Sequence, residues 1–160
     1  MTRFVRRFAP LALALAALAT LAACSGMSPG AGGGLAPGLV AEVNSPGARM
    51  DRASALQIVN QYRALRGVGP LSADAGLESA AEQVARQYAQ AGTPPAQPSG
   101  AAAMRLSAGY TNFAETFSGW RNSPVDADVM ALSNASRVGF AAVFDPNSAY
   151  GTHWVMLLGR

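Results

Sequence analysis

The order of apolar patterns along this chain limits what it can fold into. Apolar residues recur at helical spacing over residues 56–65 and again over 77–91. Residues 138–144 and 153–158 are instead apolar and β-prone, and 145–148 between them have the composition of a turn. Helices followed by a pair of strands predict the α+β class, with a small antiparallel sheet layered between helices.

Local signals set the ends of the first two helices. Asp51 and Asp74 precede the apolar patterns and are predicted to cap the helix N-termini. Gly67 and Gly92 are predicted to end the same helices, and the prolines that follow Gly92 exclude any continuation.

Two more helices are predicted before the strands. One covers residues 112–122 and places Phe113, Phe117 and Trp120 on one face, which favours a role in the core against residues 138–144. The other starts at Ser123-Pro124, since proline is favoured at the first helical position, and is expected to continue through Leu132.

The N-terminal segment resembles a bacterial lipoprotein signal. Three arginines precede an apolar run at 11–21, and the run ends in Leu21-Ala22-Ala23-Cys24. In such signals the cysteine becomes the first mature residue and carries acyl chains such as palmitate. The alternatives are an ordinary signal peptide and an uncleaved membrane helix, which the short run disfavours because spanning needs about 20 apolar residues.

This interpretation divides the chain into three parts. Residues 1–23 are the predicted signal peptide, 24–49 a Gly/Pro/Ala-rich flexible tether, and 50–160 the folded domain. The expected location is the cell envelope, with the lipid at Cys24 holding the protein on a membrane. Because Ser25 is not the aspartate that often marks inner-membrane retention, we expect the outer membrane facing the periplasm, with surface display as the alternative.

Charge and cysteine content exclude several classes of function. The formal net charge is +3, but three of the 12 basic residues lie in the predicted signal, so nine arginines balance nine acidic residues in the rest. No basic patch therefore argues for nucleic acid. Cys24 is the one cysteine, so disulfides and cysteine metal sites within the domain are excluded.

Several motifs in order resemble the CAP superfamily (cysteine-rich secretory proteins, antigen 5 and pathogenesis-related 1 proteins, also called SCP). The first two helices read Asn60-x-x-Arg63-x-x-x-Gly67-x-x-Pro70-Leu71-x-x-Asp74-x-x-Leu77-x-x-Ala80-Ala81. Later blocks are Phe113 to Pro124 with its Trp-x-x-Ser-Pro pattern, Arg137-Val138-Gly139-Phe140-Ala141, and Tyr150-Gly151-Thr152-His153-Trp154-Val155. The resemblance covers residues 50–160 and implies an α-β-α sandwich.

The chain departs from the family pattern at the family's His/Glu cavity. Met104-Arg105 stand where the resemblance places Glu-Asn, and Asp126 stands at the position of a histidine. The upstream histidine of the family has no counterpart. The resemblance therefore implies a degenerate cavity, for which Met104, Glu115, Ser123 and Asp126 are the candidate residues. We expect no bound metal and no cofactor.

Catalytic and metal-binding interpretations have weak support in the sequence. A Ser/His/Asp arrangement would need His153 with Ser148 or Ser123 and with Asp126 or Asp145, but no motif frames either serine. A zinc site needs three or four convergent ligands, and one histidine with the carboxylates of Glu115 and Asp126 is too few. Glu115 is instead expected on the solvated side of its helix, and His153 in a structural or surface role.

The function favoured by the sequence is non-catalytic binding of a ligand, either a lipid or another envelope component, by a lipid-anchored domain. A scaffold for a protein partner of unknown identity is the alternative from a different class. A hydrolase is the least favoured.

Overall fold

The structure is a computed structural model that describes residues 34–160. The predicted signal peptide, Cys24 and the first part of the predicted tether lie outside the described residues. From Leu35 to Arg160 the chain forms one compact unit. No helix among residues 34–160 has the length and apolar character needed to cross a bilayer.

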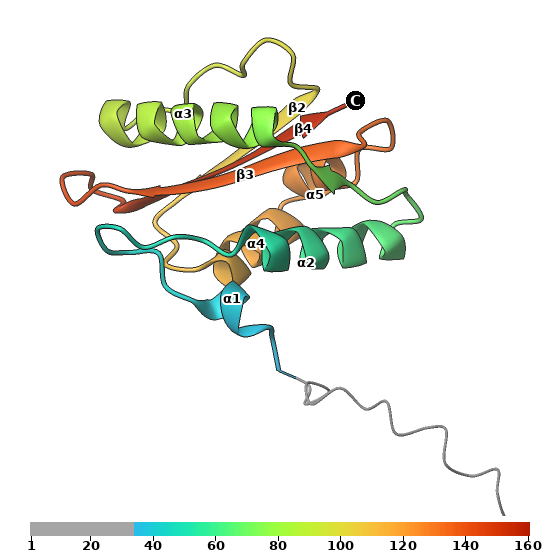
Figure 1. Ribbon diagram of the computed structural model, residues 1–160, viewed down its shortest axis with the longest axis horizontal. Helices are drawn as coiled ribbons and strands as arrows, with labels where there is room; N and C mark the ends of the chain where they lie inside the picture. The colour runs from blue at the N-terminus through green and yellow to red at the C-terminus, as the bar shows by residue number, and fades with distance from the viewer. Residues whose placement is uncertain (1–33) are drawn as a thin grey trace, which may run out of the picture. The chain divides into compact units, whose positions relative to one another are not determined.

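Four strands form one sheet with helices on both faces (Figure 1). The sheet order is β1-β3-β4-β2. Helix α3 lies on one face, and α1, α2, α4 and α5 lie on the other. The elements are α1 (Pro37–Val40), α2 (Arg52–Leu65), β1 (Ser72–Ala73), α3 (Ala75–Ala91), β2 (Ala103–Ala108), α4 (Phe113–Asn122), α5 (Pro124–Met130), β3 (Arg137–Phe144) and β4 (Thr152–Gly159).

The predicted ends of the first two helices, α2 and α3, are confirmed. Asp51 accepts a hydrogen bond from the Ser54 N–H at 3.0 Å, and Asp74 accepts one from the Leu77 N–H at 2.9 Å. These caps satisfy N–H groups that have no partner within the helix. Gly92 ends α3 in the left-handed conformation, with φ of 65°, which favours glycine.

The apolar stripe of α2 is shorter than predicted. Leu65, predicted to belong to it, is 87% exposed, because the helix ends there and Tyr62 and Arg63 are the last residues that it buries. The end of α5 also differs: the helix stops at Met130 and does not reach Leu132.

The larger core lies between the sheet and α2, α4 and α5. Phe117 and Trp120 are 5% and 2% exposed, as predicted, and belong to the same apolar cluster as Val138 and Phe140 of β3. The ring of Phe113 meets that of Phe140 edge to face at a centroid distance of 5.6 Å. The aromatic face of α4 is therefore core.

The second core lies between α3 and the other face of the sheet. Ala81, Val84 and Ala85 of α3 pack on residues of β3 and β4. Gly139 allows this close approach, since a Cβ at that position would collide with the backbone of Leu77 and Glu78. Substituting Gly139 would push α3 off the sheet.

The sheet differs from the predicted one in two ways. It is mixed and not wholly antiparallel, because the two residues of β1 pair in parallel with Arg137 and Val138 of β3. Strand β2 lies outside the two predicted strands and pairs antiparallel with β4 over its whole length. In β2 the apolar Met104 and Leu106 alternate with Arg105 and Ser107, but this alternation is too short to predict a strand by itself.

The folded unit begins earlier than residue 50. Leu39 and Val43 are 4% and 1% exposed and belong to the larger core. The Val43 N–H donates to the Thr111 carbonyl at 2.7 Å, and the Thr152 hydroxyl donates to the Val43 carbonyl at 2.7 Å. The described part of the predicted tether, from Leu35 onward, is therefore part of the domain.

The motif residues Asn60 and Arg63 have structural roles. The Asn60 side chain accepts from the Leu71 N–H and donates to the Leu71 carbonyl, at 2.8 and 2.9 Å. Arg63 is fully buried and donates to four backbone carbonyls, those of Gly69, Met130, Leu132 and Ala135. Together they tie α2 to the loops that precede β1 and β3.

Candidate functional site

An ion pair occupies the position of the expected cavity. Arg105 on β2 lies with its Nε 3.2 Å from the Oδ1 of Asp126 on α5, and the two side chains are 23% and 28% exposed. The Arg105 Nε is buried and makes no aligned hydrogen bond to any residue in 34–160. The two partly buried charges neutralise each other, so the Asp126 carboxylate is not free to bind a metal ion.

The other three candidate residues are not part of this ion pair. Met104 packs with α3 on the opposite face of the sheet, because neighbouring residues of a strand point to opposite sides. Ser123 lies between α4 and α5, where its side chain makes no cap hydrogen bond. Of the four candidates, Asp126 alone forms an ion pair with Arg105.

Glu115 supports the start of α4. Its carboxylate accepts from the Thr111 N–H at 3.1 Å and lies 3.4 Å from the Thr111 hydroxyl. The side chain of Asn112 in turn accepts from the Glu115 N–H at 3.0 Å. This reciprocal arrangement is close to a capping box and accounts for Glu115 without a ligand.

Within residues 34–160 no group of three or more His, Cys, Asp or Glu side chains could hold a metal ion. The Arg105 guanidinium would also repel a cation from Asp126. The arrangement at the expected cavity is therefore that of a structural ion pair.

His153 is buried at the start of β4. Its ring packs edge to face against Tyr88 of α3, with centroids 4.7 Å apart, and its Nε2 lies 3.3 Å from the Ser148 hydroxyl. Burial lowers the pKa of His153 below its ordinary value, and the charge of Asp145 opposes that shift weakly. The imidazole is therefore neutral near pH 7.

The Ser148–His153 contact lacks the remaining parts of a catalytic triad. The Nδ1 of His153 has no hydrogen-bond partner in the described part of the chain, although a base in a triad is oriented through that atom. Asp145 instead accepts from the Asn147 N–H at 2.9 Å within the turn. The contact is therefore that of a buried structural histidine.

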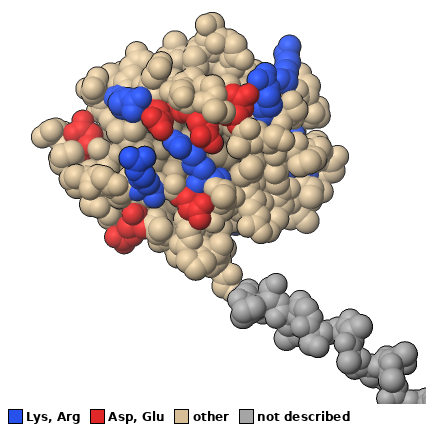
Figure 2. All heavy atoms as spheres, in the orientation of Figure 1, with Lys and Arg blue, Asp and Glu red and all other residues tan. Residues whose placement is uncertain are grey.

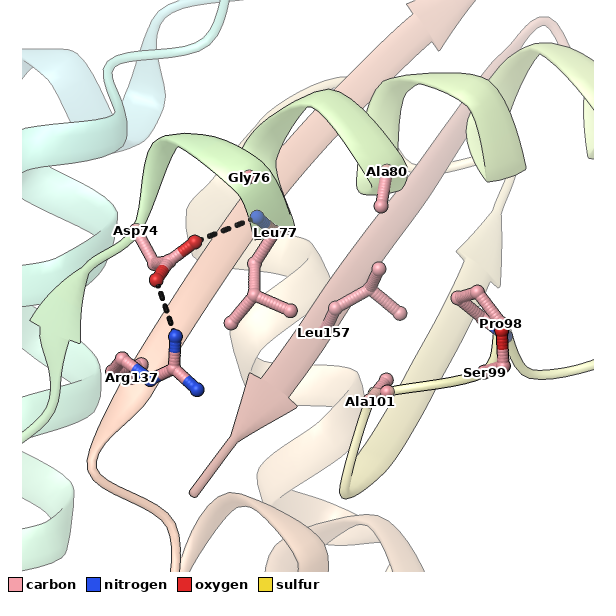
Figure 3. Close-up of a pocket in the computed structure, with 10 residues that line it drawn as sticks. Asp74, Gly76, Leu77, Ala80, Pro98, Ser99, Ala101, Arg137 and Leu157 are labelled. Atoms are coloured by element: carbon pink, nitrogen blue, oxygen red, sulfur yellow. Dashed lines mark hydrogen bonds and ion pairs between the residues drawn. The ribbon is translucent and has the colours of Figure 1, made fainter.

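A first shallow hollow of about 250 Å³ lies beside the start of α3 (Figure 3). The Asp74–Arg137 ion pair, 2.8 Å between Oδ2 and NH1, closes one end, and Pro98 and Ser99 lie toward the other. The Leu77 N–H and the Arg137 guanidinium lower the pKa of Asp74. All charges at this hollow are thus already paired.

A second hollow, of about 280 Å³, lies at the edge of β3 between α2 and α3. Figure 2 shows acidic and basic side chains gathered on this face of the molecule. Arg52 of α2 reaches across the strand edge to Glu82 of α3, 2.6 Å from NH2 to Oε1, and to Glu78 at 3.6 Å. The Arg52 Nε also donates to the Phe140 carbonyl at 2.9 Å. Neither hollow reaches Ser148 or His153.

Fold and site together define an α-β-α sandwich protein in which Arg105 and Asp126, at motif positions of the expected cavity, form an ion pair. The sequence profile of the cysteine-rich secretory protein family, CAP, matches residues 56–158, more than half of the chain. The chain belongs to this family, and the resemblance found in the sequence is confirmed. No curated protein matches it significantly in sequence.

Solved structures support the same fold. An outer surface protein from Borrelia burgdorferi superposes with a TM-score of 0.58 at 15% identity, over 71% of this chain and 97% of that one. MpPR-1i gives 0.55 at 20% identity, over 67% and 88%. An extracellular SCP-domain protein from Bacillus anthracis gives 0.56 at 12% identity, with 68% of this chain matching 40% of that one.

Sequence reasoning missed two arginines that form ion pairs at these places. Arg105 stands in the sequence only as a motif position, and its pairing with Asp126 depends on β2 and α5 being brought together by the fold. Arg52 carries no sequence signal, because its reach across the sheet edge requires the layered arrangement of α2 and α3. The one sequence signal for Arg105 is a charged residue between the apolar Met104 and Leu106, which indicates that its charge needs a partner.

Proposed function

We propose that this protein is a lipid-anchored envelope protein whose CAP domain binds a polar envelope component at its surface without turning it over. The observation that carries the proposal is the Arg105–Asp126 ion pair at the position of the family's His/Glu cavity. Because the Arg105 guanidinium pairs with Asp126, that carboxylate is not a free metal ligand, which favours binding through surface contacts over metal coordination. Members of the family are in general not catalytic.

The size of the hollows favours a polar ligand over a lipid. The two hollows hold about 250 and 280 Å³, and charged side chains line both. Pockets for drug-sized ligands are mostly apolar and hold about 300–1,000 Å³. A lipid ligand would raise the melting temperature of the protein when a fatty acid or sterol is added, and that result would contradict a polar ligand.

The anchor is proposed from the Leu21-Ala22-Ala23-Cys24 run behind a basic and apolar segment. The proposed location is the outer membrane, facing the periplasm or displayed at the surface. The similar structures named outer surface protein and extracellular protein agree with a site outside the cytoplasm.

The anchor is tested by acylation. Cys24→Ser should abolish incorporation of radiolabelled palmitate and release the protein from the membrane fraction, since the thiol is the acylated group. Ser25→Ala, the matched control next to it, should retain both. The anchor would be contradicted if the wild-type protein incorporates no radiolabelled palmitate, or if the Cys24→Ser protein still fractionates with membranes.

Binding without turnover is tested on the material that co-purifies with the wild-type protein. Mass spectrometry should find a polar envelope component that is recovered unchanged. A single stoichiometric protein would favour the alternative, a protein-interaction scaffold. Turnover of a substrate that is lost in His153→Ala would contradict the proposal and favour a hydrolase.

A further inference from the structure

The exposed edge of β3 presents backbone groups next to the second hollow. Strand β3 pairs with β4 on one side, and β1 covers only its first two residues on the other. Beyond β1, the outward carbonyl of Phe140 is taken by Arg52. Since outward-facing residues alternate along a strand, the N–H and C=O of Ala142 also point away from β4. Within residues 34–160 they have no hydrogen-bond partner.

The hollow beside Ala142 carries an excess of arginine. Three arginines and one glutamate line it: Arg49, Arg52, Arg86 and Glu82. Arg52 is neutralised by Glu82 and Glu78, and it is the main cause of the lowered pKa of Glu82.

The other two arginines are less fully paired than Arg52. Arg86 touches the same Glu82 at 3.4 Å with half of its side chain exposed. Arg49 is exposed and has no carboxylate within 4.0 Å in the described part of the chain. Arg49 and Arg86 thus flank an unpaired strand edge, and the three arginines of the hollow outnumber the two carboxylates, Glu78 and Glu82, that pair with them.

From this arrangement we infer that the β3 edge binds an extended acidic peptide segment of a partner protein. The peptide backbone pairs with the N–H and C=O of Ala142, as in strand addition, and a carboxylate side chain lies between Arg49 and Arg86. A peptide fits better than an isolated anion, because the edge offers an acceptor as well as a donor. The inference goes beyond the proposed function, because it assigns a protein partner to the β3 edge and leaves the polar envelope ligand to other surfaces.

The test is a binding titration with a defined probe. The chain that starts at residue 24 and carries Cys24→Ser is titrated into the fluorescein-labelled peptide Thr-Glu-Val-Glu-Thr. Binding is measured by fluorescence anisotropy. The matched probe has Gln in place of both Glu residues. We expect the acidic peptide to bind and the Gln peptide to bind at least about fivefold more weakly, which corresponds to one exposed charge pair.

Variants separate the groove from the rest of the surface. Arg49→Gln and Arg86→Gln should each weaken binding of the acidic peptide about fivefold, and Arg121→Gln, an exposed arginine on α4, should leave it unchanged. These surface changes do not depend on core packing. In a heteronuclear NMR spectrum the peptide should shift the amide signal of Ala142.

Three results would overturn the inference. They are equal binding of the two peptides, full binding by both groove variants, and amide shifts that leave residues 140–144 unchanged. Binding of inorganic phosphate that depends on Arg49 and Arg86, without peptide binding, would reduce the groove to a simple anion site and also overturn it. None of these results changes the outcome of the acylation test. Failure of the peptide-binding inference can therefore be told apart from failure of the proposed lipid anchor.

Discussion

Replacing Arg63 by methionine should destabilise the domain strongly. The guanidinium is fully buried and donates to the carbonyls of Met130 and Ala135 inside the protein, at 2.8 and 3.1 Å, and to those of Gly69 and Leu132 nearer the surface. Burial lowers the pKa of Arg63, because it disfavours the charged form. The carbonyl dipoles that accept its hydrogen bonds stabilise the charge that remains. The two inner carbonyls would lose their partners at about 1–3 kcal/mol each, which gives a loss of about 2–6 kcal/mol.

The assay is urea unfolding of the chain from residue 24 with Cys24→Ser, followed by circular dichroism and tryptophan fluorescence. Arg63→Lys should lose less than Arg63→Met, because an ammonium keeps the charge but reaches fewer carbonyls. Arg66→Met is the control in the same region, since its exposed pair with Asp128 and its hydrogen bond to the Tyr62 hydroxyl are together worth about 1–2 kcal/mol. A loss below about 1 kcal/mol for Arg63→Met at an unchanged m value would refute the reasoning, because the carbonyls would then have found other partners.

The core, the buried histidine and the ion pair give three further predictions. Trp120→Ala should lower the free energy of unfolding in urea by about 3–5 kcal/mol, because it leaves a cavity in the core. Trp120→Phe should lower it by only about 1 kcal/mol, for the lost hydrogen bond to the Leu106 carbonyl. Equal losses for the two variants would count against the packing argument. Because burial lowers the pKa of His153, the unfolded chain takes up the proton first, and stability should fall as the pH drops below about 6.5. His153→Gln should show a shallower fall over that window, and parallel pH curves would contradict this. Calorimetric titration with zinc should show no micromolar one-to-one binding, and EDTA or dithiothreitol should leave the melting temperature unchanged; zinc binding weakened by Asp126→Ala would show a surviving cavity.

The parts of the fold that local chemistry encodes could be predicted. Asp51, Asp74 and Gly92 act within one helical turn, so their roles are visible in the sequence. The two residues of β1 are too few to leave a pattern, and β2 depends on β4 for its pairing. Leu39 and Val43 escape prediction because they lie in a Gly- and Pro-rich stretch whose composition suggests a linker.

The candidate site is harder to predict than the fold. Glu115 is expected on the solvated side of its helix, and its exposed carboxylate accepts from the nearby Thr111 N–H, as local sequence allows. The partner of Asp126 is not predictable, since Arg105 comes from a strand 21 positions earlier and meets it only through tertiary packing. Position in a motif assigns Met104 to the cavity, but the two-residue period of β2 turns it to the other face.

If Cys24 carries the proposed lipid, the early start of the folded unit limits how far the domain can reach from the membrane. Only eleven positions separate Cys24 from Leu35, where the compact unit begins. A chain of that length spans at most about 36–40 Å even when fully extended. With a lipid at Cys24, the domain would stay within roughly one domain diameter of the bilayer. Any partner would then have to approach within that distance of the lipid surface.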